Sequence, residues 1–124
     1  MSKTEQPVDL QHLDRYTGGD RAINEEILRL FDAQCREMLA TLDSLAAGEH
    51  DAKSWRATLH TLKGAARAIG AFALGDAAAA AEQAASERDV ALVALTPLKA
   101  SFAAVHRFIE DFLSRRAFIG AETR

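Results

Sequence analysis

Residues 59–70 read LHTLKGAARAIG, and this stretch decides how the rest of the chain is interpreted. Its apolar residues belong to a longer series, spaced by 4, 3, 4 and 3 positions, that is typical of one face of an α-helix. The series consists of Trp55, Leu59, Leu62, Ala66 and Ile69. We predict a helix that begins after Asp51, a candidate N-cap, and ends at Gly70. Gly64 lies inside this helix, where glycine costs about 1 kcal/mol relative to alanine, so its presence needs an explanation.

The composition favours helices over strands. The chain has 124 residues, is rich in alanine, leucine and charged side chains, and contains 7 glycines and 2 prolines. This length fits one domain, spanning residues 1–124. We therefore expect an all-α fold: an antiparallel up-down four-helix bundle, with its core at about residues 20–118 and a short N-terminal capping helix.

Helical periodicity also predicts the elements before residue 51. A short helix over LQHLDRYT follows Asp9 and is closed by Gly18 and Gly19. Asp20 can cap a long helix that ends at Gly48. The apolar stripe predicted for this long helix consists of Ile23, Ile27, Leu30, Phe31, Met38, Leu42 and Leu45.

Two further helical segments follow Gly70. An alanine-rich helix is expected from Ala71 to about Ala85, with small side chains that let neighbouring backbones approach closely. In the last segment, Thr96 and Pro97 resemble an N-cap and a first helical position, so we expect a break or kink there. The apolar stripe of this segment consists of Leu98, Phe102, Val105, Ile109 and Phe112.

The charge and cysteine content exclude several classes of protein. The net charge of −3 and the pI near 5.8 argue against recruitment of nucleic acid or of an anionic membrane. A single cysteine, Cys35, rules out an internal disulfide framework. The opening MSKTEQPVDL lacks the apolar core of a signal peptide, and we find no apolar run near 18 residues that would span a membrane. These features predict a soluble, cytoplasmic protein.

A basic stripe runs beside the apolar face of the helix that contains residues 59–70. His60 is turned about 100° from the core series and should face solvent. No acidic residue occurs between Lys53 and Arg67. The stripe consists of Lys53, Arg56, His60, Lys63 and Arg67. Because charge runs are usually solvated helix faces, that simpler interpretation stays open for the cations.

Gly64 and Gln34 distinguish this stripe from an ordinary solvated face. Gly64 lies one turn after His60 and, lacking a side chain, leaves the imidazole clear for another macromolecule. Gln34 occupies the step between Phe31 and Met38 on an apolar stripe. If the two helices are antiparallel neighbours, its amide could reach His60 or an anion attached to it; the alternative is a boundary glutamine bonded to backbone or water.

These residues suggest phosphoryl chemistry. Neutral imidazole is nucleophilic near neutral pH, so it can accept a phosphoryl group and pass it on. Lys63 and Arg67 would neutralise the phosphoryl oxygens, and Gln34 would add a neutral donor. The chain has no glycine-rich nucleotide loop and no evident carboxylate cluster for magnesium, so we expect a phosphoryl carrier without its own ATP site, cofactor or metal.

The sequence HTLKGAARAIG closely resembles the signature of histidine phosphotransfer (HPt) domains, and the resemblance extends to GGDRAINEEILRLFDAQ before it and AFALGDAAAAAEQAA after it. It implies a monomeric bundle that shuttles phosphoryl groups between aspartates of response-regulator receiver domains, sometimes from a hybrid histidine kinase. Magnesium would belong to the receiver. His60 would then be the phosphoacceptor through Nε2, Lys63 would contact the phosphoryl group, and Gly64 would give clearance. Gln34 matches a position that is often polar in the family. The resemblance leaves Arg67, like Arg56 and Lys53, as a partner contact.

Two other functional classes are alternatives for a helical bundle of this kind. A helical adaptor would bind receiver or kinase domains without being phosphorylated, but the reactive histidine is present. A bundle enzyme with a metal centre needs Glu-x-x-His or His-x-x-x-His pairs, and neither occurs in the sequence. Of the other histidines, His12 and His50 are expected at the surface and His106 at the edge of a helix stripe. The particular kinase, the particular receiver and the direction of transfer are not encoded in these motifs.

Overall fold

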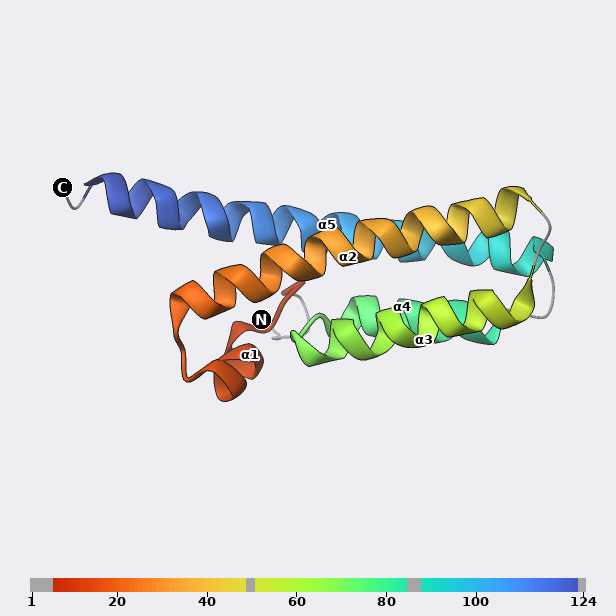
Figure 1. Ribbon diagram of the computed structural model, residues 1–124, viewed down its shortest axis with the longest axis horizontal. Coiled ribbons are helices and arrows are strands. Elements are labelled where there is room, and N and C mark those ends of the chain that lie inside the picture. The colour runs from red at the N-terminus through yellow and green to blue at the C-terminus, as the bar shows by residue number, and fades with distance from the viewer. Residues whose placement is uncertain (1–5, 49–50, 85–87, 123–124) are drawn as a thin grey trace.

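The computed structural model describes residues 6–48, 51–84 and 88–122, with side chains over these ranges except 88–89 and 116–122. The described residues form five α-helices, and Figure 1 shows the four longer ones running alternately up and down the molecule, with the short one at the end where α2 begins. The helices are α1 (Leu10–Thr17), α2 (Arg21–Ala47), α3 (Ala52–Ala68), α4 (Phe72–Gln83) and α5 (Arg88–Glu122). The prediction of an all-α bundle with a short N-terminal helix is confirmed.

Aspartates begin the first three helices, as the sequence predicts. The Asp9 carboxylate accepts hydrogen bonds from the backbone N–H groups at the start of α1, and Asp20 does the same for α2. Asp51 accepts from the N–H groups of Lys53 and Ser54 in α3. Each cap satisfies donors that a first helical turn leaves unpaired, which fixes where the helix starts.

Helices α3 and α4 pack closely against each other. Trp55 of α3 is fully buried, and its indole Nε1 donates to the carbonyl oxygen of Ala81 in α4 at 2.9 Å. The face of α4 that packs inward is made of small or medium side chains: Leu74, Gly75, Ala78 and Ala81. Small side chains allow the two backbones to approach, so the alanine-rich stretch serves packing, as we expected.

The face that α2 turns inward differs from the predicted stripe. The residues buried in α2 are Asn24, Leu28, Phe31, Cys35, Leu39, Leu42 and Ala46, while Ile23 and Leu30 are exposed. Cys35 therefore holds the central place that the prediction gave to Gln34. The prediction is confirmed for Phe31 and Leu42, and Ile27, Met38 and Leu45 pack partly buried against the core. It was wrong for Ile23 and Leu30, because α2 carries apolar residues on more than one face and periodicity alone does not select the face that packs.

Helix α5 continues through Pro97 without the break that we predicted. Proline removes the hydrogen bond to the carbonyl group four residues earlier. That residue is Val93, which is 73% exposed, so water can solvate the freed carbonyl. Leu98, directly after the proline, is fully buried and holds this part of α5 against the core.

One stretch of α5 is long and apolar enough to cross a membrane by length and composition alone. It spans Val90–Arg115 among the described residues. The expectation that no stretch of the chain is apolar enough to span a membrane is therefore wrong by the criteria of length and composition. The core helix of a bundle has the same properties, and Leu98, Val105 and Ile109 of this stretch are buried within the bundle.

Candidate functional site

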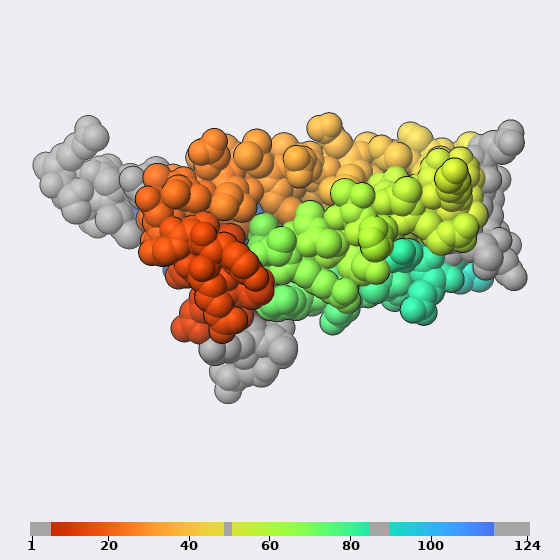
Figure 2. All heavy atoms as spheres, turned by 60° about the horizontal axis from the view of Figure 1, so that its bottom comes forward, coloured from red at the N-terminus to blue at the C-terminus, as the bar shows by residue number. Residues whose placement is uncertain are grey.

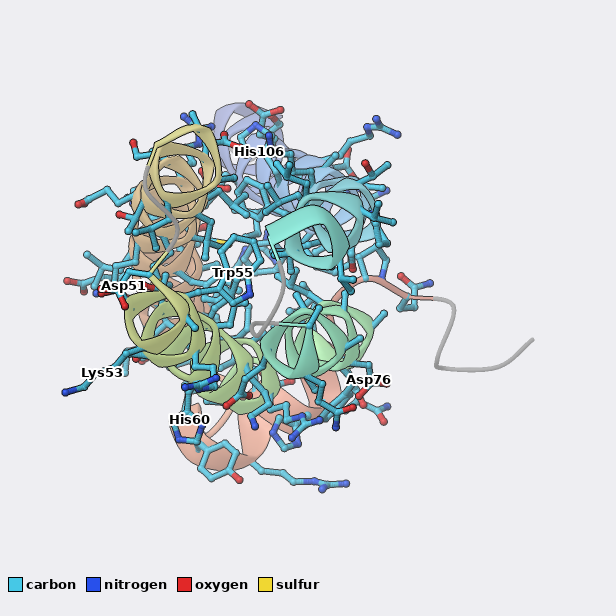
Figure 3. All side chains as sticks on the ribbon, turned by 90° about the vertical axis from the view of Figure 1, so that its right-hand side faces the viewer. Asp51, Lys53, Trp55, His60, Asp76 and His106 are labelled. Carbon is cyan, nitrogen blue, oxygen red and sulfur yellow. The ribbon has the colours of Figure 1, made fainter. Side chains whose placement is uncertain are left out.

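Helix α3 presents His60 on the outside of the bundle. Trp55 and Leu59 point to the core, and Figure 3 shows Trp55 inside the bundle and His60 outside it. The His60 side chain is 72% exposed. In Figure 2, α3 lies across the middle of one face of the molecule, with α2 along one edge and α1 at one end. The prediction that His60 is a solvent-facing histidine is confirmed.

Gly64 is not required by the packing of the chain. It is exposed, and a Cβ added to it would meet no heavy atom within 4 Å. The residue lies one helical turn from His60, on the outer face of α3. A glycine in this position lowers helix stability without relieving any clash among the described residues.

Lys63 and His60 share a carboxylate that α4 supplies. Lys63 Nζ lies 2.9 Å from Glu82 Oε1, and His60 Nδ1 lies 3.6 Å from Glu82 Oε2. The side chains of Lys63 and Glu82 are only 23% and 22% exposed. The hydrogen bond from Lys63 lowers the pKa of Glu82, and the positive charge of Lys63 adds to this effect. Glu82 is therefore ionised at neutral pH.

Arg67 is also held by α4. Its guanidinium lies 3.4 Å from Asp76, and its aliphatic stem crosses Gly75, where a Cβ would stand 2.8 Å from Arg67 Cγ. Asp76 and Glu82 thus supply the negative charges that the sequence of α3 lacks. Two cations of the basic stripe are therefore paired with carboxylates of α4. The sequence of α3 by itself does not indicate this pairing.

Lys53 and Arg56 are the cations of the stripe that lack an ion pair within the described residues. Both are exposed, and Lys53 points away from the bundle in Figure 3. Arg56 borders a shallow depression of about 370 Å³ between α3 and α4. The other residues around it are Lys63, Ala79, Glu82 and Gln83. These two positive charges are therefore not compensated within the part of the chain that the structure describes.

Gln34 and Glu82 stand in different relations to His60. Gln34 is exposed on α2, and within the described residues its amide makes no hydrogen bond to His60. The polar group beside the imidazole is instead the Glu82 carboxylate. A signal was available: α3 and α4 form an antiparallel hairpin around Gly70, so acidic residues of α4 had to lie near the cations of α3.

Two other histidines have different surroundings. His106 is bonded between the carboxylates of Asp32, at 2.7 Å, and Glu110, at 3.2 Å, which confirms a satisfied boundary histidine. His12 lies between the rings of Tyr16 and Phe72. His50 lies outside the described residues. Over the described ranges, no group of three or more histidine, cysteine, aspartate or glutamate side chains could hold a metal ion.

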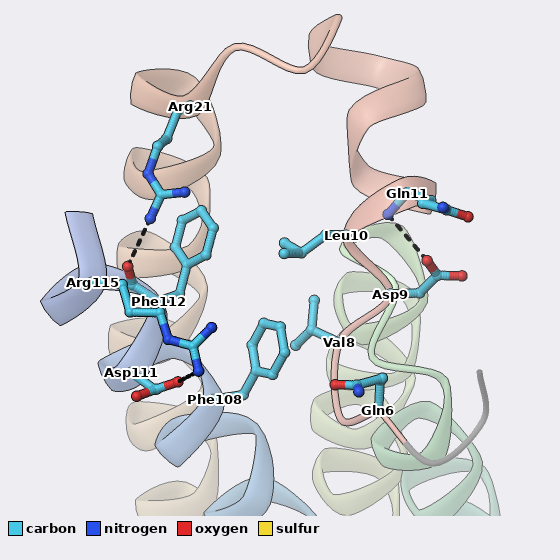
Figure 4. A pocket seen from close by; sticks show the side chains of 10 residues that line it. All are labelled: Gln6, Val8, Asp9, Leu10, Gln11, Arg21, Phe108, Asp111, Phe112 and Arg115. Atoms are coloured by element: carbon cyan, nitrogen blue, oxygen red, sulfur yellow. Dashed lines mark hydrogen bonds and ion pairs between the residues drawn. The ribbon is translucent and has the colours of Figure 1, made fainter. Parts of the chain in front are cut away.

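A second hollow, of about 560 Å³, lies at the end of the bundle where the segment before α1 meets α5. Figure 4 shows Val8 and Leu10 facing Phe108 and Phe112 across it. The Arg21 guanidinium stacks on the Phe112 ring, 4.1 Å from its centroid, and donates to the Phe112 carbonyl oxygen. The hollow shares no residue with the surroundings of His60.

The fold and the site define a class: a helical bundle that displays one histidine beside a lysine and an open glycine. Residues 26–114 match the family model of the Hpt domain, and the chain belongs to this family. The match confirms the expected family, whose members transfer phosphoryl groups through a histidine in phosphorelays and act as carriers without a kinase catalytic domain.

The fold is also similar to that of a known structure. A crystal structure described as a histidine-containing phosphotransfer protein from rice superposes with a TM-score of 0.76 at 21% sequence identity. The alignment covers 90% of this chain and 82% of the rice chain. This likeness supports the fold. No curated protein is significantly similar to the chain in sequence.

Proposed function

We propose that His60 accepts a phosphoryl group on Nε2 and exchanges it with aspartates of response-regulator receiver domains. One observation carries this proposal: an exposed imidazole stands one turn from a glycine that the chain's own packing does not need. The clearance at Gly64 would let the active face of a receiver approach the ring. The family to which the chain belongs supplies the reaction class.

The bonds that form and break in the transfer belong to the imidazole and to the phosphorylated aspartate of the receiver. The lone pair of Nε2 attacks phosphorus as the P–O bond to the receiver aspartate breaks, and the aspartate leaves as a carboxylate with the electron pair. The reverse step returns the phosphoryl group to an aspartate. Magnesium bound by the receiver would neutralise charge on the phosphoryl oxygens, because the described residues of this chain provide cations rather than a metal site there.

The charges around His60 suit an acidic partner. A receiver needs carboxylates to bind magnesium, so its active face is negative, and exposed Lys53 and Arg56 would attract it. Arg67 is proposed as a further contact with the partner, and Gln34 as a neutral donor to the phosphoryl group. A hybrid histidine kinase is the proposed source of phosphoryl groups, and we expect the protein to act as a cytoplasmic monomer that binds neither nucleic acid nor membranes.

The test is transfer from a phosphorylated receiver. We expect acid-labile, alkali-stable label on the wild-type chain, none on His60→Gln, and wild-type labelling of the control His12→Gln, with equal helical content in all three. Label retained by His60→Gln would refute the assignment of His60. Binding to the receiver without any label would favour the alternative, a helical adaptor that is not phosphorylated.

A further inference from the structure

The hollow at the end of the bundle takes no part in the proposed chemistry of His60. It has a volume of about 560 Å³ and lies between the segment before α1 and a wall that α2 and α5 form (Figure 4). Pockets that bind small molecules span roughly 300 to 1,000 Å³ and combine an apolar lining with a few polar groups. The hollow has a suitable size, so its lining decides which ligand it can hold.

Two opposite sides of the hollow are apolar. On one side Val8 is buried and Leu10 is half-buried. On the other side the rings of Phe108 and Phe112 project from successive turns of α5. Both rings are only half-buried, so part of their apolar surface is still in contact with water. An aliphatic chain or an aromatic ring between these sides would remove this surface from water, which favours binding.

The arginines at the hollow have donors to spare. Arg21 donates to the Phe112 carbonyl oxygen, but its Nε is buried and makes no hydrogen bond; Glu25 Oε2 lies 3.5 Å from it. A buried donor without an acceptor is rare in folded proteins. Arg115 pairs with Asp111 through one nitrogen, at 3.1 Å. Because a guanidinium carries several N–H donors, Arg115 can bind a second anion without leaving Asp111.

The carboxylates at the hollow are already bound. Asp9 accepts hydrogen bonds from the backbone N–H groups of Gln11 and His12. Asp111 is held by Arg115. An anion at the hollow would therefore meet unused donors and negative charges that are already compensated. This charge distribution favours a ligand with an apolar body and an anionic head.

We propose that the hollow binds a small amphipathic carboxylate, with its apolar body between Leu10 and the two phenylalanine rings and its head group on Arg21 and Arg115. Such a ligand would join the segment before α1 to α5. Because the hollow shares no residue with the surroundings of His60, the bound ligand leaves the histidine free. The inference goes beyond the proposed function and does not depend on it.

The test uses the full chain with decanoate and naphthoate, which represent the aliphatic and the aromatic form of this class. Isothermal titration calorimetry should show saturable binding of at least one of them. In NMR spectra the backbone amide signals of Val8, Leu10 and Phe112 should shift, while those of His60 and Gly64 stay in place. The uncharged counterparts, decanol and naphthol, should bind about fivefold more weakly, because an exposed ion pair contributes up to about this factor.

Two variants separate the apolar body from the head group. Leu10→Trp should abolish binding, because the larger side chain fills the hollow. Arg115→Gln should weaken carboxylate binding about fivefold and leave binding of the uncharged counterpart unchanged. The matched control is Arg107→Gln, which removes the same charge from an exposed position of α5 outside the hollow. Its affinities should stay within about twofold of wild type.

Absence of binding by both carboxylates, or NMR shifts confined to another surface, would overturn the proposal. Equal affinities for the carboxylate and its uncharged counterpart, or equal effects of Arg115→Gln and Arg107→Gln, would refute the anionic head group. Circular dichroism checks that each variant is folded. If Leu10→Trp is not, Phe108→Ala takes its place; it removes one apolar side and should weaken the carboxylate and its uncharged counterpart alike.

Discussion

The backbone of Asp9 lies directly against Gly70. The Asp9 N–H donates to the Gly70 carbonyl oxygen at 2.9 Å, and a Cβ added to Gly70 would stand 2.5 Å from the Asp9 carbonyl oxygen. Gly70 also has a φ of 89°, which L side chains rarely adopt. The glycine that ends the 59–70 stretch thus lets the segment before α1 dock on the turn between α3 and α4.

Gly70→Ala should destabilise the fold. The substitution combines backbone strain with a clash against main-chain atoms that cannot rotate away, so we expect a loss of about 2 to 4 kcal/mol in the free energy of unfolding. Urea denaturation of the variant and the wild type measures this. A loss below about 0.5 kcal/mol, the range of an ordinary surface substitution, would contradict the described contact with Asp9.

Gly64→Ala should have the opposite effect on stability. The site is open, so alanine should raise the free energy of unfolding by up to about 1 kcal/mol while reducing the room beside His60. Transfer from a phosphorylated receiver should slow, and more so for Gly64→Gln. The control Ala104→Gln places the same side chain on the exposed face of α5. Equal transfer rates for Gly64→Gln and this control would show that clearance is not the role of the glycine.

Lys53 and Arg56 should act on the approach of the partner. They are exposed and lack ion pairs among the described residues, and their field extends over a Debye length of about 8 to 10 Å. Arg56→Gln should lower the second-order rate of transfer and flatten its dependence on salt, while a saturating receiver restores the maximal rate. Arg67→Gln should change the rate less, because Asp76 already compensates this charge. A larger effect for Arg67 than for Arg56 would refute this ranking.

Lys63 should differ from these peripheral cations. It is half-buried beside His60, so Lys63→Ala should alter the maximal transfer rate or the lifetime of phosphohistidine even with saturating receiver. Stopped-flow transfer and decay of the isolated phosphoprotein measure the two quantities. An effect limited to the salt-dependent association rate would show that Lys63 acts on binding of the receiver, as Lys53 and Arg56 do, and not on the phosphoryl group.

Glu82 should make stability depend on acid pH. Lys63 lowers its pKa below the ordinary value of 4.5, so the folded chain binds a proton to this group less readily than the unfolded chain does. The resulting stabilisation is fully present above the pKa of the unfolded state and is lost as the pH falls through the lowered value. Between pH 6 and pH 3, the free energy of unfolding should therefore fall less steeply with falling pH for Glu82→Gln than for the wild type. Parallel curves for the variant and the wild type would contradict the ion pair.

Cys35 should be unreactive in the native protein. Burial, with a further contribution from the Asp32 charge, raises the pKa of its thiol from 9.0 to about 12. At pH 8 the thiolate fraction is then about a thousandfold lower than for a thiol of ordinary pKa. Labelling by a maleimide should be correspondingly slow in buffer and fast in urea. Rapid native labelling would show that α2 does not bury this face.

The sequence by itself determined those features that depend on neighbours along the chain. The aspartate caps were predicted because a cap binds amides only two or three residues away. The outward direction of His60 was predicted because the apolar series of α3 occupies a single face. The signature around Lys63 and Gly64 was sufficient to indicate the family, and the family match confirmed it.

Only the tertiary structure decided which helices face one another, and this set the surroundings of the histidine. Glu82 lies 19 residues from Lys63, so no local pattern pairs them. The buried face of α2 was decided by competition between apolar faces, which put Cys35 rather than Gln34 inside. The burial of one face of α2 and the ion pairs between α3 and α4 both depend on contacts between helices. Helix periodicity shows only which side chains share a face.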